Sequence, residues 1–319
     1  MPHLLIAGQL HPSGLGLLNG AEGITYDYVE DLSEHSYAPL VGNADGLVIR
    51  TQPLSAATVA GAGRLKIVSR HGVGYDSVDV AALNAHGIPL CIVGDVNSIS
   101  VAEHAMMLIL ACAKFLLLAD HAVRRGPWGW RNQLEAGEIS GKRLMIVGYG
   151  RTGRHLARMA AGFDMQIRAY DPFFGESDWP AGPATPVGSL VDGLAWADVI
   201  SVNVPKVGRP VLGAEELAHV QQGVILVNTA RGGIVDEDAL AAALADGRVA
   251  AAGLDVFDAE PPPAHHPLLS FDQVLLTPHV AGLTQQAAER MAVASVQNIL
   301  DFFAGRIDPD LIVNKGSLT

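Results

Sequence analysis

The segment Gly148–Gly153 has the spacing Gly-x-Gly-x-x-Gly and constrains the fold of this chain more than any other stretch. The apolar run Arg143–Val147 before it predicts a buried strand, and Arg154–Ala160 after it has the apolar spacing of a helix. A strand, a glycine turn and a helix in this order are typical of a dinucleotide-binding turn. There the free N–H groups at the helix N-terminus face the pyrophosphate.

An acidic residue is expected about 20 residues further on, where it binds the ribose hydroxyls. The run Gln166–Tyr170 predicts the next strand, and Asp171 follows it directly. The sequence therefore predicts a Rossmann-type nucleotide site that includes Asp171 and the glycines Gly148, Gly150 and Gly153.

Composition limits the other classes of function. The chain has 319 residues, which favours two domains. Its 21 Lys and Arg against 33 Asp and Glu argue against nucleic acid or a membrane surface as partner, because both attract basic proteins. Cys91 and Cys112 lie in apolar runs, so we expect buried thiols in a reducing cytoplasm, with no disulfide and no metal site. We also expect neither a signal peptide nor a membrane-spanning segment.

Strands and helices are expected to alternate along most of the chain, which predicts parallel sheets covered by helices on both faces. In the first part, the expected strands are 4–7, 46–50, 66–69 and 89–93, and the expected helices are 55–62 and 77–86. After residue 141, further strands are expected at 198–202, 223–228, 250–255 and 273–277. Asp236 is expected to cap a helix that ends at Asp246-Gly247. A last helix, 285–304, is expected to return to the first domain.

Residues 98–119 form the longest helical pattern and are apolar on several faces. Such a helix is expected to be buried against another surface, for example a second subunit. The loop after it carries Trp128 and Trp130, which pack either on a partner or on their own domain.

Three polar residues, Arg231, Glu260 and His279, each follow an expected strand of the second part. Because parallel strands end at one edge of the sheet, their side chains are expected near the glycine turn. A histidine exchanges a proton near neutral pH, and a carboxylate can hold its imidazolium. An arginine can bind a carboxylate through two parallel hydrogen bonds. Each residue alone could be an ordinary surface group, but together they predict a catalytic site.

Longer motifs containing these residues occur in one order, at 70–79, 101–104, 148–153, 228–236, 254–261 and 277–279. They resemble the D-isomer-specific 2-hydroxyacid dehydrogenases, which include phosphoglycerate dehydrogenase-like enzymes, over nearly the whole chain. The resemblance implies an α/β protein of two doubly wound parallel-sheet domains. A Rossmann NAD-binding domain, 98–283, would be inserted in a flavodoxin-like substrate domain formed by 1–97 and 284–319.

The resemblance also implies roles for individual residues. His279 would be the acid/base and Glu260 its hydrogen-bonded partner, while Arg231 would bind the substrate carboxylate and carbonyl. The backbone amides of Val73 and Gly74 would hold the other side of that carboxylate.

The cofactor implied is NAD. Arg151 and Thr152 would lie on the pyrophosphate, and Asp171 on the adenosine ribose, where its charge disfavours the 2′-phosphate of NADP. The other cofactor contacts implied are Val204, Pro205, Thr229, Ala230, Asp255 (near the carboxamide) and Gly282.

The implied activity is hydride transfer between NAD(H) and a small anionic 2-hydroxy or 2-oxo acid, in a cytoplasmic homodimer formed through the NAD-binding domain. The alternatives are an NADH-sensing protein similar to the related corepressors, or oxidation of formate or phosphite. Asn203–Pro205 departs from the His-x-Pro of many members. Arg50 either contacts a substrate phosphate or is a solvated strand end, so the identity of the acid stays open.

Overall fold

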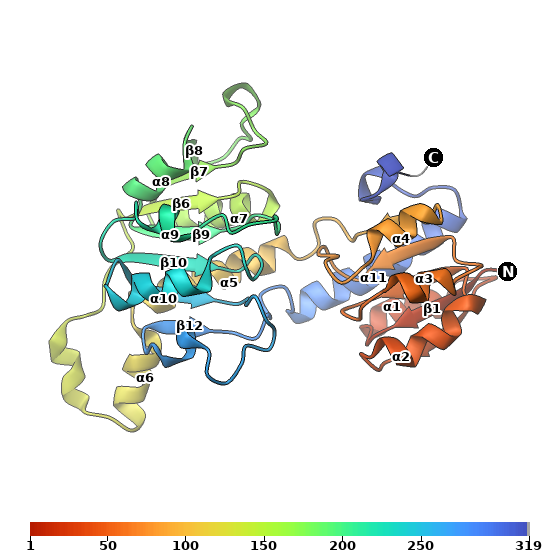
Figure 1. The fold of residues 1–319 in the computed structure, drawn as a ribbon, viewed down its shortest axis with the longest axis horizontal. Coiled ribbons are helices and arrows are strands. Elements are labelled where there is room, and N and C mark those ends of the chain that lie inside the picture. The colour runs from red at the N-terminus through yellow and green to blue at the C-terminus, as the bar shows by residue number, and fades with distance from the viewer. Residues whose placement is uncertain (318–319) are drawn as a thin grey trace. The chain divides into compact units, whose positions relative to one another are not determined.

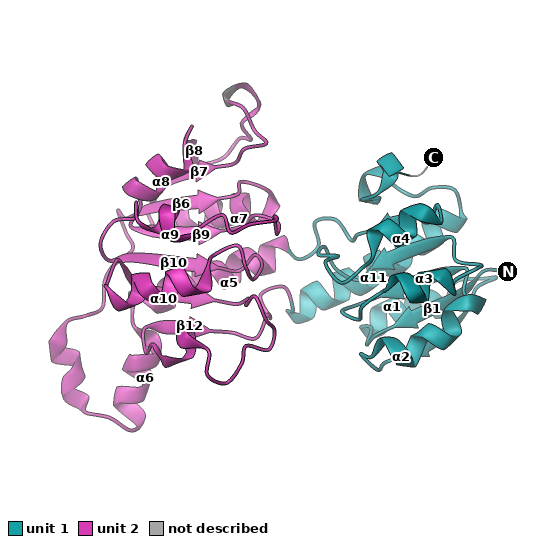
Figure 2. Cartoon of the chain, in the orientation of Figure 1, with its two compact units in different colours: residues 1–97, 283–319 teal, residues 98–282 magenta. Residues whose placement is uncertain are grey.

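The computed structural model describes residues 1–317 and divides into two compact units (Figure 2). Unit 1 comprises Met1–Asn97 and Leu283–Thr319, and unit 2 comprises Ser98–Gly282. Each unit is built on one parallel sheet with helices on both faces (Figure 1). This is the fold class that the motifs imply.

The sheet of unit 1 has the strand order β2-β1-β3-β4-β5, which is the flavodoxin-like order. Its strands are β1 (His3–Ala7), β2 (Thr25–Val29), β3 (Gly46–Ile49), β4 (Ile67–Arg70) and β5 (Leu90–Cys91). Its helices are α1 (Pro12–Asn19), α2 (Glu34–Tyr37), α3 (Ala56–Ala60), α4 (Val80–Ala85) and α11 (Gln285–Phe303). The central strands are apolar on both faces and almost completely buried, as expected between two helical layers. Ala292, Val296 and Ile299 of α11 pack in this core, so the last helix is part of unit 1.

The sheet of unit 2 has the strand order β12-β11-β10-β9-β6-β7-β8. Its strands are β6 (Arg143–Val147), β7 (Gln166–Tyr170), β8 (Thr185–Pro186), β9 (Val199–Val202), β10 (Val224–Asn228), β11 (Val249–Leu254) and β12 (Val274–Leu276). Its helices are α5 (Ser98–Ala113), α6 (Leu116–Arg124), α7 (Arg151–Ala161), α8 (Leu190–Trp196), α9 (Ala214–Leu217) and α10 (Glu237–Ala245). The strand order reverses between β6 and β9, and ligands of such sheets bind at the strand ends beside this point.

Two apolar cores cover the two faces of the unit 2 sheet. Helices α5 and α7 pack on one face through side chains such as Leu108, Ile109 and Leu156. The other core includes Leu240 and Leu244 of α10. A side chain on Gly253 of β11 would lie 2.8 Å from Cβ of Leu108, so glycine lets α5 approach the sheet closely. Helix α5 is thereby fixed against the sheet.

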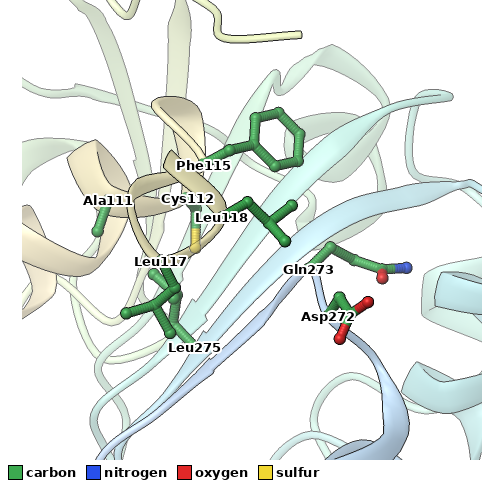
Figure 3. Close-up of a pocket in the computed structure, with 8 residues that line it drawn as sticks. All are labelled: Ala111, Cys112, Phe115, Leu117, Leu118, Asp272, Gln273 and Leu275. Atoms are coloured by element: carbon green, nitrogen blue, oxygen red, sulfur yellow. The ribbon is translucent and has the colours of Figure 1, made fainter. Parts of the chain in front are cut away.

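The single helix predicted over 98–119 is wrong, because the structure has two helices bent by 60° at a break. Phe115 at this break has a left-handed backbone, with φ of 47°. Helix α5 is held by its buried face, whereas Leu116 and Leu117 beyond the break are exposed. A small hollow lies there, between Phe115, Leu117 and the amino end of β12 (Figure 3). Within the described chain, no single helix is long and apolar enough to cross a membrane; α5 and α6 pass that test of length and composition only as this bent pair.

The predicted cap of α10 can be tested by substitution. The Asp236 carboxylate accepts a hydrogen bond of 2.9 Å from the Ala239 N–H. We expect Asp236→Ala to lower the free energy of unfolding of unit 2 by about 1 kcal/mol, measured by urea titration. Asp238→Ala removes an exposed carboxylate from the same turn and should cost only about 0.3 kcal/mol. Equal losses in the two variants would contradict the capping role.

Candidate active site

The glycine turn joins β6 to α7, and two of its glycines are required by close packing. Gly148 has a φ of 96°, and a side chain there would lie 2.7 Å from the Asn203 carbonyl oxygen. A side chain on Gly153 would lie 2.2 Å from the carbonyl oxygen of Gly148. These two glycines therefore allow β6, β9 and α7 to approach one another.

Gly150, unlike the other two glycines of this turn, is next to open space. A side chain there would meet nothing within 4 Å, so the backbone faces an open cradle at the start of α7. Gly150 is the N-cap of α7, no side chain caps the helix, and its first turn carries no acidic residue. Arg151 and Thr152 are the first two residues of this turn. An uncapped helix N-terminus beside an open glycine backbone fits the pyrophosphate of a dinucleotide.

Asp171, directly after β7, is held beside this turn. Its Oδ2 accepts a hydrogen bond of 2.8 Å from the Tyr149 N–H, and its Oδ1 accepts one of 3.0 Å from the Phe173 N–H. The carboxylate thus stands at the end of the strand next to the glycine turn, where the Rossmann fold binds a ribose.

Two buried polar atoms near the ends of β9 and β10 lack a hydrogen-bond partner within the described residues. They are Oδ1 of Asn203 and Oγ1 of Thr229. Leaving a buried polar atom unpaired is costly, so a ligand that supplies the partner binds favourably. Val204 and Pro205 follow Asn203 in the same loop, and Val204 lies against Gly148. These two unpaired atoms suit the nicotinamide half of a dinucleotide, which has an amide and ribose hydroxyls.

The loop that carries Arg231 is fixed by a buried asparagine. Asn228 accepts a hydrogen bond of 3.0 Å from the Ala230 N–H and donates one of 3.0 Å to the Arg231 carbonyl. A side chain on the next residue, Gly232, would lie 1.8 Å from the Phe257 carbonyl oxygen. The Arg231 loop therefore packs directly on the loop that leads to Glu260.

Glu260 and His279 are brought together, 2.7 Å apart between Oε2 and Nδ1. The other carboxylate oxygen of Glu260 accepts a hydrogen bond of 3.0 Å from the Phe257 N–H. Because a carboxylate only accepts, Nδ1 of His279 carries the proton of this bond, and Nε2 is left for a ligand. Both side chains are partly exposed, so a small molecule can reach them.

The loop Thr277–Ala281 is wrapped around the buried carboxylate of Asp255. Its Oδ1 accepts hydrogen bonds from the Thr277 hydroxyl (2.6 Å) and the Val280 N–H (2.9 Å), and its Oδ2 accepts from the Ala281 N–H (2.9 Å). His279 has a φ of 52°, and its N–H donates to the Asp255 carbonyl at 2.8 Å. A left-handed histidine persists only where its surroundings hold it. The Asp255 carboxylate is turned into the protein, and Gly282 follows this loop at the end of unit 2.

In unit 1, Val73 and Gly74 lie in the loop after β4. The Arg70 side chain folds this loop by donating from Nε to the Gly74 carbonyl (2.8 Å) and from Nη1 to the His71 carbonyl (3.2 Å). Within residues 1–317, neither the Val73 nor the Gly74 N–H donates a hydrogen bond. Two unpaired N–H groups in one loop can bind an anion.

Arg50, directly after β3, is half-buried, and its guanidinium makes no hydrogen bond or ion pair with the described chain. Burial, followed by the charge of Arg50, lowers the pKa of His71 to about 4. His71 is therefore neutral at neutral pH. The guanidinium of Arg50, at the carboxyl end of β3, is thus a positive group with which an anionic ligand can form an ion pair.

Several residues that support the site were not given a role by sequence reasoning. Glu237 accepts a hydrogen bond of 2.8 Å from the Asp258 N–H and bonds Nε2 of His266 at 2.9 Å, which holds both ends of the Glu260 loop. Asn228 and Thr277 lie inside recognised motifs, which is the signal that could have revealed them. In the part of the chain that the structure describes, no three His, Cys, Asp or Glu side chains are grouped as a metal site requires.

Comparison with known proteins agrees with this geometry. Residues 106–281 match the model of the D-isomer specific 2-hydroxyacid dehydrogenase, NAD binding domain. The chain is 38% identical over 315 residues to the D-3-phosphoglycerate dehydrogenase of Mycobacterium tuberculosis, which covers 98% of this chain and 59% of that protein. It therefore spans less than two thirds of that relative's length.

Two further relatives match over most of their own length. The hydroxypyruvate reductase of Thermotoga maritima is 37% identical over 275 residues, or 85% of this chain and 88% of that protein. The solved NADPH-dependent glyoxylate/hydroxypyruvate reductase of Sinorhizobium meliloti has a TM-score of 0.83 and 29% identity, covering 95% of each chain. Unit 2 is thus an NAD-binding domain, and the chain belongs to the D-isomer-specific 2-hydroxyacid dehydrogenase family.

Proposed function

We propose that the protein transfers a hydride between NAD(H) and C2 of a small D-2-hydroxy or 2-oxo acid. The observation that carries this proposal is the pair formed by Nδ1 of His279 and Oε2 of Glu260, 2.7 Å apart. The pair stands at the carboxyl edge of a Rossmann sheet, where a bound nicotinamide would need an acid/base beside it. NAD(H) supplies or accepts the hydride when it is bound.

The residues of the chain handle the proton and the substrate. In the reducing direction, Nε2 of protonated His279 donates its proton to the substrate carbonyl oxygen; in the oxidising direction, neutral Nε2 accepts the hydroxyl proton. Glu260 fixes the tautomer and holds the imidazolium. Arg231 binds the substrate carboxylate and carbonyl and so orients C2.

Unit 1 carries two features that are suited to binding an acid. The unpaired N–H groups of Val73 and Gly74 are suited to a carboxylate oxygen. The guanidinium of Arg50, which has no partner in the described chain, is suited to a second anionic group on the substrate. These features favour a small acid as substrate and leave open whether it is phosphorylated.

The proposed cofactor contacts follow the geometry of unit 2. The cradle of Gly148, Gly150 and Gly153, with Arg151 and Thr152, holds the pyrophosphate. The contacts of the nicotinamide half are Val204, Pro205, Thr229, Ala230 and Gly282, and Asp255 contributes through the loop that it fixes. We propose NAD in preference to NADP because the Asp171 carboxylate would repel a 2′-phosphate.

We further propose a homodimer formed through unit 2. Exposed apolar side chains gather on α5, α6 and the turn after them, and Figure 1 shows α6 on an arm that leaves the body of this unit. The exposed apolar side chains of this region are Ile99, Met107, Leu116, Leu117, Val123, Trp128 and Leu134. An arm with this much exposed apolar surface is typical of a subunit interface.

We propose a cytoplasmic location. Cys91 and Cys112 are both buried and free, and burial raises the pKa of each thiol to about 12. Buried, protonated thiols suit a reducing compartment.

The acid/base assignment is tested by His279→Ala. We expect kcat for reduction of glyoxylate and hydroxypyruvate to fall about 100-fold or more. The dissociation constant for NADH, measured by fluorescence, should stay nearly unchanged because the cradle is intact. His219→Ala changes an exposed histidine of the same unit and should keep activity. Full activity in His279→Ala would overturn the assignment, and tight NADH binding without turnover in the unmodified protein would favour an NADH sensor.

The cofactor preference is tested by comparing NADH with NADPH. The unmodified protein should prefer NADH by about tenfold or more in kcat/KM, because like charges in contact are unfavourable. In Asp171→Ala that preference should largely disappear, through loss of activity with NADH and gain with NADPH. Equal use of both cofactors by the unmodified protein would contradict the role of Asp171.

The dimer is tested by sedimentation equilibrium. Val123→Glu and Trp128→Glu each place a charge on the arm and should raise the dimer dissociation constant at least about tenfold. Leu32→Glu changes an exposed leucine of unit 1 and should leave it unchanged. A monomeric unmodified protein at micromolar concentration would refute this proposal.

A further inference from the structure

We propose that His104, on α5, is a positioning residue for the loop Thr277–Ala281 and acts on His279 through Thr277 and Asp255. The inference rests on the proposed acid/base role of His279. Nε2 of His104 lies 2.9 Å from Oγ1 of Thr277, although the two residues are 173 positions apart in the sequence. The same Nε2 lies 3.6 Å from Oδ1 of Asp255.

The direction of these hydrogen bonds follows from the chemistry of the groups. The Thr277 hydroxyl is 2.6 Å from Oδ1 of Asp255, and the carboxylate can only accept. The single hydroxyl proton of Thr277 therefore points at Asp255, and its oxygen must accept from His104. Nε2 of His104 consequently carries a proton, and the chain of donors runs from His104 through Thr277 to Asp255.

Burial strengthens the effect of this chain of hydrogen bonds. The Asp255 side chain is 0% exposed and that of His104 is 15% exposed, so water competes little for either group. A hydroxyl can rotate among several orientations, and only one of them points its proton at the carboxylate. Donation by His104 occupies a lone pair of the Thr277 oxygen and selects that orientation.

The loop that carries His279 is bonded to both oxygens of this carboxylate. The N–H groups of Val280 and Ala281 donate to its two oxygens, each at 2.9 Å. His279 itself donates from its N–H to the Asp255 carbonyl. An altered Thr277 hydroxyl shifts the carboxylate, and with it the backbone on either side of the imidazole.

Helix α5 gives His104 a fixed position from which to act. Its neighbours Ala105 and Leu108 are buried against the sheet and α7. His104 therefore ties a packed helix to a loop that also makes hydrogen bonds to Asp255. The expected consequence is a loss of kcat with little change in cofactor affinity, since the proton-transfer geometry depends on small displacements.

The test compares His104→Phe, which removes the donor but keeps a ring, with His104→Gln, which can still donate to Thr277. We expect His104→Phe to lower kcat about tenfold and to leave the NADH dissociation constant within about twofold. His104→Gln should recover most of the loss. His219→Phe, at an exposed histidine whose ring makes no hydrogen bond within the described chain, serves as the matched control and should keep kcat.

A double variant tests whether His104 acts through the Thr277 hydroxyl. In a Thr277→Val background the hydroxyl is gone, so adding His104→Phe should lower kcat no further. Amide hydrogen exchange of the Thr277–Ala281 segment should quicken in His104→Phe, in Thr277→Val and equally in the double variant. The thermal unfolding midpoint of each variant distinguishes a loss of overall stability from a displacement of the Thr277–Ala281 loop.

Several results would overturn the proposal. They are an unchanged kcat in His104→Phe, equal losses in His104→Phe and His104→Gln, or additive losses in the double variant. Hydrogen exchange is measured without substrate, so it decides whether His104 positions the loop even if the unmodified protein turns over no 2-oxo acid. Absence of turnover in the unmodified protein would refute the proposed function but not the positioning role of His104.

Discussion

A buried carboxylate determines the shape of the edge of unit 2 where Glu260 and His279 meet. Asp255 ends β11 with its side chain removed from water, and a charge in that setting is tolerated only when hydrogen-bond donors surround it. The loop after β12 supplies those donors from one hydroxyl and two backbone N–H groups. The backbone that satisfies Asp255 also fixes the unusual conformation of His279. The position of the His279 imidazole is thus a consequence of stabilising the buried charge of Asp255.

Two carboxylates at this edge have opposite surroundings and so different uses. Asp255 is enclosed, and both of its oxygens are occupied by groups of the chain. Glu260 is partly exposed and has one oxygen on His279 and the other on the Phe257 N–H. The first shapes a loop, and the second holds the tautomer of the imidazole that we propose as the acid/base. The same functional group performs a structural task and a chemical task because the exposure differs.

Much of this arrangement could be predicted from the sequence. The glycine turn and Asp171 follow from local spacing, and the rule that parallel strands end at one edge gathers Arg231, Glu260 and His279 there. The break at Phe115 was not predicted, because apolar spacing continues through it. Strand β2 was missed since its Tyr and Asp residues suit a half-buried edge and give no apolar run.

The proposed role of His104 was also not predictable from the sequence, although its motif was recognised. Its partner Thr277 lies far along the chain, and only packing of α5 on the sheet brings the two together. Spacing predicts contacts within one element or at one sheet edge. It does not predict hydrogen bonds that cross from a helix face to a distant loop.

The uncapped start of α7 links cofactor binding to the stability of the fold. Helices usually satisfy their first N–H groups with a serine, threonine or aspartate, and α7 has only glycine at that position. A dinucleotide phosphate bound there acts as the missing cap, so part of its binding energy completes the helix. By mass action, the folded population of unit 2 rises with the concentration of free cofactor. A higher concentration of free cofactor would then lower the unfolded fraction of the protein and slow its degradation by proteases.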